Sequence, residues 1–288
     1  MSTLKKISCI FLLLSTSLVI NSSSADSMCV MCHQAASMNT HMRFGGSEKN
    51  DRQPGCTSCH GDSTTHLSNP MNQSPDVTFK SVSGASTEPQ NNQCRACHKK
   101  TTQHWDNSVH ALEDLSCNSC HKVHGQKEAL LAPEQQIAMC TNCHQQVRSE
   151  VRLPSHHPIE EAEMTCTACH NPHGSITPGE LTGISLNDTC LTCHESQRGP
   201  FLFDHPPASD DCTNCHRPHG SVHEPLLTAR GPQLCQQCHV ANFHPSDLNA
   251  GGGLPGRQAS ASLLGKNCMS CHPAVHGSNH PSGARLTR

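Results

Sequence analysis

The most obvious shortage in this sequence is of aromatic side chains. The 288 residues contain no Tyr, one Trp (Trp105) and six Phe, and only 34% of the residues are hydrophobic. Burial of apolar surface is the dominant favourable contribution to folding. The polypeptide has too little apolar material for a core of its own, and we predict that the chain without its cofactors is disordered.

Long apolar runs are also missing beyond the N-terminus. A bilayer crossing requires roughly 20 consecutive apolar residues, and the one comparable stretch is 7–20, which follows Lys5 and Lys6 and precedes the small residues 23–25. This order is typical of a cleaved secretory signal. We therefore expect residues 1–25 to be removed and the mature protein to reach the periplasm.

Charge of one sign is not in excess either. The net charge is −3, and removal of Lys5 and Lys6 makes it −5 (−3 − 2). Nucleic-acid-binding domains usually carry a basic patch, whereas this chain has no basic arm, phosphate-binding loop or nucleotide fingerprint. We expect no nucleic-acid partner.

What the sequence has in abundance is the pentad Cys-x-x-Cys-His, which occurs ten times. Random placement at this composition gives 21/288 × 21/288 × 24/288 × 288, or about 0.1 copies. The pentad is the attachment site of c-type haem: two thiols add to the vinyl groups of one haem, and the adjacent imidazole is an axial ligand of its iron. The sequence therefore predicts ten covalently attached haem c groups.

The predicted attachment residues are the two cysteines of each pentad, Cys29, Cys32, Cys56, Cys59, Cys94, Cys97, Cys117, Cys120, Cys140, Cys143, Cys166, Cys169, Cys190, Cys193, Cys212, Cys215, Cys235, Cys238, Cys268 and Cys271. The predicted proximal ligands are the pentad histidines, His33, His60, His98, His121, His144, His170, His194, His216, His239 and His272.

A zinc site or a disulfide framework is the alternative for so many cysteines. A structural zinc site takes four ligands from two separated half-sites, whereas every unit here ends in the same Cys-His pair. Cys9 is expected to leave with the signal, so 21 − 1 = 20 cysteines remain, and ten haems use all of them. This count favours haem.

The motifs form an internal repeat whose unit is a pair of haem motifs. Those at Cys117, Cys166, Cys212 and Cys268 are followed closely by His-Gly, and the motifs between them lead to His-Pro. The pair period is 49, 46 and 56 residues. Such a repeat predicts similar modules that mainly contact their neighbours.

The predicted fold class is a multihaem cytochrome c, elongated and mostly irregular, with short α-helices that carry the motifs, little or no β-sheet, and a core formed by haems. Nineteen Pro and nineteen Gly leave little room for long helices. We expect an N-terminal pentahaem half, 26–150, and a C-terminal one, 151–288. The polar stretches 61–92 and 246–267 are expected to be surface loops or spacers.

Fourteen of the 24 histidines remain after the ten proximal ligands. A haem with histidine on both faces has no open coordination position, so it transfers electrons and does not easily activate a substrate. Surface histidines are the alternative, and Met28 or Met31 could instead ligate the first haem and raise its potential. So many spare histidines favour ligation by a second histidine.

Spacing in the sequence restricts which haem some of the fourteen remaining histidines can ligate. Residues three apart on a helix are neighbours on one face, so His124, His173 and His219, each three residues after a proximal histidine, are expected to ligate a neighbouring haem. His110, His157 and His205 precede the next motif by 7 to 9 residues. That is long enough for the chain to pass around a ring edge.

Beyond the pentads, the strings NPHGS (171–175), RGPFLFDHPP (198–207), NCHRPHGSV (214–222), ARGPQLCQQCH (229–239) and VHGSNHPSG (275–283) resemble the MtrA/DmsE family of periplasmic decahaem c-type cytochromes over essentially the whole mature chain. The first motif begins only a few residues after the expected signal, so the chain resembles a family member without the usual N-terminal extension.

The resemblance implies the second axial ligands. They are His41, His66, His110, His124, His157, His173, His205, His219, His244 and one of His276 and His280, while His104, His156 and His223 do not match the family pattern.

The resemblance also implies an electron-transfer conduit with no enzymatic activity, which serves extracellular respiration. Its implied partners are an outer-membrane β-barrel protein that surrounds it, an outer-surface multihaem cytochrome or terminal reductase, and a periplasmic or inner-membrane quinol-linked cytochrome donor. A freely diffusing periplasmic shuttle and, less favoured, a multihaem reductase are the alternatives. A reductase would need an open haem, which ten complete pentads and the absence of Tyr argue against.

Overall fold

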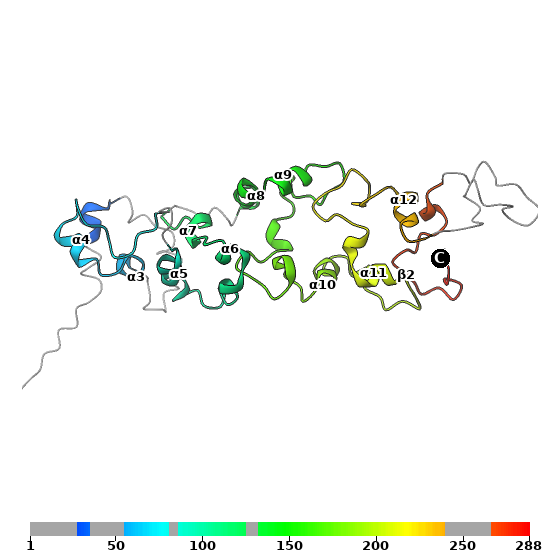
Figure 1. Ribbon diagram of the computed structural model, residues 1–288, viewed down its shortest axis with the longest axis horizontal. Coiled ribbons are helices and arrows are strands. Elements are labelled where there is room, and N and C mark those ends of the chain that lie inside the picture. Colours follow the sequence, from blue (N-terminus) through cyan, green and yellow to red (C-terminus); the bar gives the residue numbers. More distant parts are fainter. Residues whose placement is uncertain (1–27, 35–54, 81–85, 125–131, 240–265) are drawn as a thin grey trace, which may run out of the picture. The chain divides into compact units, whose positions relative to one another are not determined.

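The computed structural model describes residues 28–34, 55–80, 86–124, 132–239 and 266–288 (Figure 1). The chain forms two compact units: unit 1 comprises residues 1–80 and 123–126, and unit 2 comprises 81–122 and 127–288. The predicted signal, His41 and His244 lie outside the described residues. The predicted halves 26–150 and 151–288 follow from motif order and stay a prediction.

Every regular element is short. The helices are α3 (Cys56–His60), α4 (Thr64–Ser68), α5 (Glu88–Arg95), α6 (Val109–Leu112), α7 (Cys117–Cys120), α8 (Pro133–Cys143), α9 (Gln145–Glu150), α10 (Leu186–Leu191), α11 (Pro206–Asp210) and α12 (Gly231–Gln236), with 3₁₀ turns η2 (Trp105–Asn107), η4 (Cys166–Ala168), η5 (Pro178–Glu180), η6 (Glu195–Gln197), η7 (Cys212–Asn214) and η8 (Cys268–Ser270). Strands β1 (Phe203–Asp204) and β2 (Gly277–Ser278) pair antiparallel. The prediction of a mostly irregular chain with short helices and little sheet is confirmed.

The pentads lie on single helical turns. In nine of them the backbone N–H of the proximal histidine donates to the carbonyl of the first cysteine at 2.9–3.0 Å. The longest described helix, α8, shows why such elements stay short: Pro133 occupies its first turn, and His144 leaves the helical conformation at its end. One turn thus brings two thiols and an imidazole to the same side of the backbone.

The hydrophobic core is correspondingly small. In the part of the chain that the structure describes, Ile137, Val151 and Ile159 form the one buried apolar cluster, and Trp105 and Leu227 are buried elsewhere. All of these residues belong to unit 2. The scarcity of apolar residues in the sequence therefore reappears as a scarcity of protein core.

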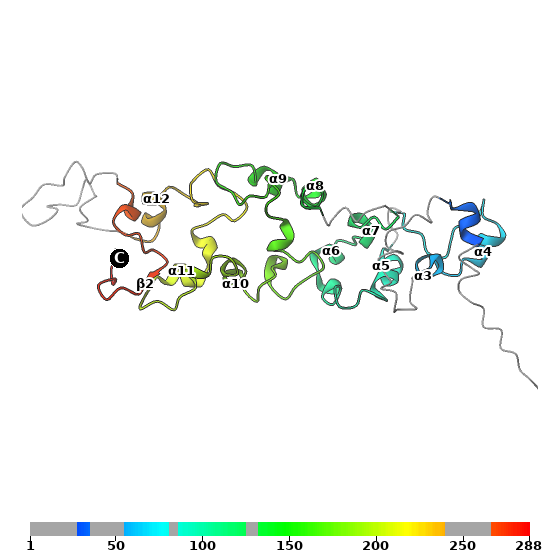
Figure 2. The same ribbon diagram turned by 180° about the vertical axis from the view of Figure 1, so that it is seen from behind.

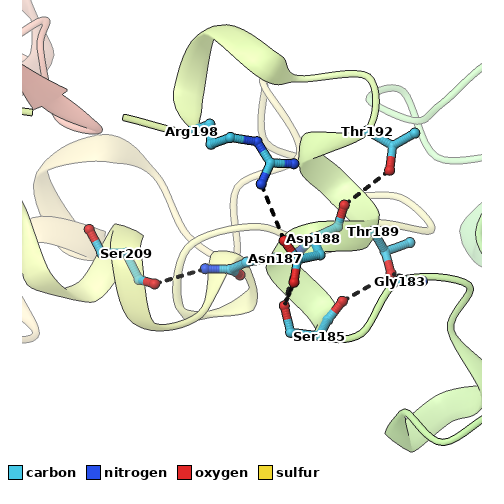
Figure 3. A network of polar contacts seen from close by, with 8 residues as sticks. All are labelled: Gly183, Ser185, Asn187, Asp188, Thr189, Thr192, Arg198 and Ser209. Carbon is cyan, nitrogen blue, oxygen red and sulfur yellow. Dashed lines mark hydrogen bonds and ion pairs between the residues drawn. The ribbon is translucent and has the colours of Figure 1, made fainter. Parts of the chain in front are cut away.

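Within unit 2 the elements follow one another in chain order, from α5 and α7 through α8 and α10 to α12 and β2 (Figures 1 and 2). Helix α10 is held by a network of polar contacts (Figure 3). Its N-cap, Ser185, accepts a hydrogen bond from the backbone N–H of Asp188, and Arg198 pairs with the Asp188 carboxylate at 3.3 Å. Side-chain caps of this kind satisfy the free N–H groups at a helix start.

The polar stretch 61–92 contains more structure than the surface loop that we expected. Helix α4 lies within it, and the backbone of Ser63 donates to the Asp76 carboxylate at 2.9 Å. No helix in the described ranges is both long and apolar enough to span a bilayer.

Candidate haem-binding sites

We number the ten pentads, each with its proximal histidine, as sites 1 to 10 from the N-terminus. No two of the twenty pentad cysteines are joined by a disulfide bond. In the described part of the chain, no three His, Cys, Asp or Glu side chains gather into a group that could hold a metal ion.

Eight proximal histidines each face one other histidine, with ring centroids 5.8–6.2 Å apart. The pairs are His33 with His66 (site 1), His60 with His124 (site 2), His121 with His173 (site 4), His144 with His110 (site 5), His170 with His219 (site 6), His194 with His157 (site 7), His216 with His276 (site 8) and His239 with His205 (site 9).

This separation is the one expected for two imidazoles that share a metal ion. Two metal–nitrogen distances of about 2.0 Å and about 1.1 Å from each nitrogen to its ring centre place the centroids about 6 Å apart. Rings in direct contact adopt offset or edge-on arrangements over a wider range of distances. Here the interplanar angle varies from 14° to 65° while the distance changes by only 0.4 Å (6.2 − 5.8). Equal spacing at every tilt fits an iron atom between the rings.

The other ring nitrogen of the proximal histidines in sites 2, 6, 8 and 10 bonds to the backbone. The Nδ1 atoms of His60, His170, His216 and His272 lie 2.7–3.0 Å from the carbonyl oxygens of Val77, Gly179, Pro225 and Arg285. Donation from Nδ1 to a carbonyl fixes the tautomer and leaves Nε2 as the ligand atom, as metal-bound histidines commonly do. The rings are therefore oriented for ligation.

Three facing histidines bond through Nδ1 to a carbonyl that belongs to a neighbouring site. His110 of site 5 contacts the carbonyl of Pro172, which precedes His173 of site 4. The same arrangement links His157 to Pro218 O (sites 7 and 6) and His205 to Val275 O (sites 9 and 8), at 2.8 Å each. The facing ligands of sites 4 and 5, 6 and 7, and 8 and 9 are thus adjacent.

The first cysteines connect the remaining neighbours. In the haem-free chain the side chains of Cys94 and Cys117 lie close enough across sites 3 and 4 for each thiol to shift the pKa of the other, upward at Cys94 and down to about 7 at Cys117. Cys140 and Cys166, Cys190 and Cys212, and Cys235 and Cys268 interact in the same way across sites 5 and 6, 7 and 8, and 9 and 10. Sites 3 to 10 therefore adjoin one another without interruption, in motif order.

The facing histidines of sites 4, 6 and 8 are half-buried. Burial, followed by the neighbouring imidazoles, lowers the pKa of His173 and His276 below the usual histidine value. Burial also lowers the pKa of His219, against an opposing effect of Glu150. A lowered pKa favours the neutral imidazole, which is the form that ligates metals.

The positions of the predicted second ligands differ from expectation in one respect. As spacing suggested, His124, His173 and His219 do not face the proximal histidine of their own motif; each faces that of the site two places earlier in the chain. His110, His157 and His205, however, face His144, His194 and His239, and none of them faces the motif that directly follows it.

The structure distinguishes His276 from His280. His276 faces His216, whereas the Nδ1 atom of His280 lies 2.8 Å from the hydroxyl of Ser282. Within the described ranges, His104, His156, His223 and His280 do not belong to the facing pairs.

Glycines that follow three facing histidines were not assigned a role from sequence. A Cβ on Gly174 would lie 2.4 Å from the carbonyl oxygen of His104, one on Gly220 would lie 2.0 Å from that of Glu150, and one on Gly277 would lie 2.3 Å from the Phe201 ring. The recurring His-Gly pair was the available signal. It marks a close approach of the backbone to another segment, to a backbone carbonyl at Gly174 and Gly220 and to the Phe201 ring at Gly277.

Exposed aliphatic side chains also escaped sequence reasoning. A cavity of about 490 Å³ is lined by Ile176, Leu181 and Ile184 together with His170 and His173. Ile176 and Ile184 are 76% and 80% exposed in the polypeptide alone. In the sequence they could have been recognised as aliphatic residues within an otherwise polar segment. Such side chains fit the apolar face of a porphyrin.

Comparison with known proteins agrees with these sites. Residues 156–199 and 205–243 match the doubled CXXCH motif family, and residues 56–143 match the family of NrfB-like c-type cytochromes. The chain is 40% identical over 273 residues to the multiheme cytochrome MtrA of Shewanella baltica (strain OS185), a match that covers 92% of this chain and 81% of that protein. The chain therefore belongs to the MtrA family of multihaem c-type cytochromes, binds haem c and transfers electrons.

Proposed function

We propose that this protein carries ten bis-histidine haems and conducts electrons along them across the outer membrane. The observation that supports the proposal best is the uninterrupted adjacency of sites 3 to 10 through shared carbonyls and paired first cysteines. The bound haem irons supply the reversible one-electron chemistry. The polypeptide supplies the ligands, their orientation and the spacing between sites.

The same ligation is proposed for all ten sites. At sites 1, 2 and 4 to 9, the histidines named above would be the two axial ligands. His41 and His244, the remaining predicted second ligands, lie outside the described residues and stay proposed ligands. With an imidazole on each face, an iron has no position left for a substrate. This supports an electron-transfer protein without catalytic activity of its own.

The proposed partners follow from the family resemblance. They are an outer-membrane β-barrel protein around the chain, a multihaem cytochrome or terminal reductase on the outer surface, and a periplasmic or inner-membrane quinol-linked cytochrome as donor. The protein would accordingly reside in the periplasm in association with the outer membrane. In this position the consecutive haem sites would transfer electrons from a periplasmic donor to an extracellular acceptor.

Purification from the native organism tests the conduit. A tag on the C-terminus is used to isolate the protein from outer membranes solubilised in mild detergent, and a β-barrel protein is expected to co-purify in constant ratio. Reconstituted in liposomes that contain a redox dye, that complex should reduce the dye from an external donor, whereas the barrel protein alone should not. Recovery of the cytochrome only from the periplasmic fraction, with no barrel protein, would favour the shuttle.

Ligation and stoichiometry are tested separately. A pyridine haemochrome assay with quantified protein should return ten haems per chain, and the EPR spectrum of the oxidised protein should contain only low-spin signals. Substantial high-spin iron would indicate open sites and revive the reductase alternative.

A further inference from the structure

We propose that Glu150 lowers the reduction potential of site 6 selectively, by placing its negatively charged carboxylate beside the facing histidine of that site. This inference rests on the proposed bis-histidine ligation. Glu150 is a positioning and tuning residue, because it acts on the iron through His219.

The contact itself is direct. The Nδ1 atom of His219 lies 3.3 Å from the carboxylate oxygen Oε2 of Glu150, while the His219 ring faces His170 of site 6 at 6.0 Å. At sites 5, 7 and 9 the corresponding nitrogen of the facing histidine bonds to a neutral backbone carbonyl. Site 6 therefore has a negatively charged group beside this nitrogen where these sites have a neutral carbonyl.

The carboxylate is held in place from several directions. Gln146, one turn earlier on α9, donates through Nε2 to the other carboxylate oxygen, Oε1, at 2.7 Å. The backbone carbonyl of Glu150 accepts from the N–H of Leu153 at 3.0 Å, and it lies where a Cβ on Gly220 would have to be. The next residue, Val151, is 1% exposed. The Glu150 side chain is therefore already ordered in its position beside His219.

The repeat shows that the carboxylate is specific to one site. Glu150 lies six residues after His144, the proximal histidine of site 5, and the same count from His98 and His194 leads to His104 and Pro200. The match with His104 is also structural, since its carbonyl approaches Gly174 as that of Glu150 approaches Gly220. Of these three equivalent positions, only the one beside site 6 carries an acid.

The direction of the effect follows from charge. A carboxylate beside the Nδ1–H group of an imidazole raises the basicity of the ligating nitrogen. A more basic ligand, together with a nearby negative charge, stabilises ferric iron relative to ferrous iron. Groups that interact with an axial ligand are an established means of setting haem potentials. Site 6 is therefore expected to be harder to reduce than it would be with a neutral acceptor.

The test is EPR-monitored potentiometry of the purified holoprotein. His219→Met first identifies the signal of site 6, because that variant removes one histidine ligand. Glu150→Gln is nearly isosteric and removes the charge. It should move the midpoint of the identified signal upward on the order of tenfold in the equilibrium constant, or 59 mV for one electron, and leave the other signals in place. Glu150→Asp, which keeps the charge but withdraws it from Nδ1, should give a smaller upward shift.

Glu160→Gln is the matched control, because Glu160 pairs with Arg152 at 3.1 Å and contacts none of the facing histidines. It should shift no midpoint. Two other variants serve if Glu150→Gln does not mature with a full haem complement. Glu150→Asp withdraws the carboxylate and Gln146→Ala loosens it, and each should move the midpoint of site 6 upward.

The possible failures are distinguishable. An unmodified protein without bis-histidine low-spin signals would overturn the proposed ligation. Intact bis-histidine signals with an unmoved site 6 midpoint in the Glu150 variants would overturn the role of Glu150 alone, as would an equal shift in Glu160→Gln.

Discussion

The side-chain oxygen of Asn187 accepts a hydrogen bond from the backbone N–H of Cys212 at 2.9 Å. Asn187 belongs to helix α10, which carries the first cysteine of site 7, and Cys212 is the first cysteine of site 8. The side-chain amide nitrogen of Asn187 donates in turn to the carbonyl of Ser209 at 3.0 Å (Figure 3). One amide thus fixes the distance between two consecutive attachment turns.

The same relationship occurs at sites 3 and 4. Asn91 lies three residues before Cys94, as Asn187 lies three residues before Cys190, and its oxygen accepts from the N–H of Cys117 at 2.8 Å. Its amide nitrogen donates to the carbonyl of Leu115 at 3.0 Å. The pair repeat therefore preserves a polar bond between motifs as well as the motifs themselves.

Loss of the side-chain amide of Asn91 or of Asn187 should destabilise the holoprotein. Replacement by alanine leaves a backbone N–H and a carbonyl without a partner, which costs about 1–3 kcal/mol when the groups are buried. We expect about 2 kcal/mol for Asn91→Ala, since Asn91 is 5% exposed, and about 1 kcal/mol for the more accessible Asn187→Ala. Guanidinium denaturation of the holoprotein, followed by circular dichroism, measures the loss. Asn72→Ala, at an exposed turn, should be neutral, and an equal loss there would refute this assignment.

Replacement of one facing histidine should change one site only. His173→Met keeps both thioether bonds of site 4, so the haem count should stay the same, while methionine in place of histidine raises the potential of that site. Potentiometry should show one midpoint displaced upward among otherwise unchanged values. His223→Met, outside the facing pairs, is the control. A parallel displacement in the control would argue against His173 as a ligand.

Alanine should be far less acceptable at Gly174 than at Gly179. Both glycines have positive φ, 100° and 73°, so both substitutions introduce backbone strain of about 1–2 kcal/mol. A Cβ at position 174 would in addition overlap the His104 carbonyl, whereas its nearest neighbour at position 179 would be the Leu181 side chain at 4.0 Å. We expect Gly174→Ala to lower the yield of fully haem-loaded protein and Gly179→Ala to retain it, as measured by absorbance per protein mass. Equal yields would contradict the proposed close packing.

The haem-free chain should not fold. Expression without the haem-attachment machinery leaves Trp105, Ile137, Val151, Ile159 and Leu227 as the buried hydrophobic residues of the described part, too few to offset the conformational entropy of so long a chain. Circular dichroism and heating should show a disordered polypeptide without a cooperative transition. A compact, cooperatively melting apoprotein would contradict this expectation, and the holoprotein from the same vector is the control.

The sequence predicted the irregular fold and its short motif-bearing turns because both follow from local chemistry. Pentad spacing sets one helical turn, and nineteen Pro and nineteen Gly interrupt longer elements. It did not predict α4 within the polar stretch 61–92. That helix is five residues long and brings His66 to face His33, with Nδ1 bonded to the carbonyl of Gln73 at 2.7 Å. Such a contact depends on chain reversal, which composition does not encode.

The partners of the facing histidines were beyond local reasoning for the same reason. His219 lies three residues from His216 in the chain, yet it faces His170, 49 residues away. The choice is made by tertiary contacts, namely the Glu150 carboxylate at its Nδ1 and the packing of Gly220 against the Glu150 backbone. The sequence could indicate that His219 serves a neighbouring site but not which one.

In unit 2, sites 4, 6 and 8 each receive a facing histidine from the motif two places further along the chain: His173, His219 and His276. An extra copy of one such module, such as the 46 residues from Cys166 up to Cys212, would donate an imidazole upstream and accept one from downstream through interfaces that already exist. Gene duplication could therefore extend the reach of this cytochrome by two cofactors at a time, with no new interface to evolve.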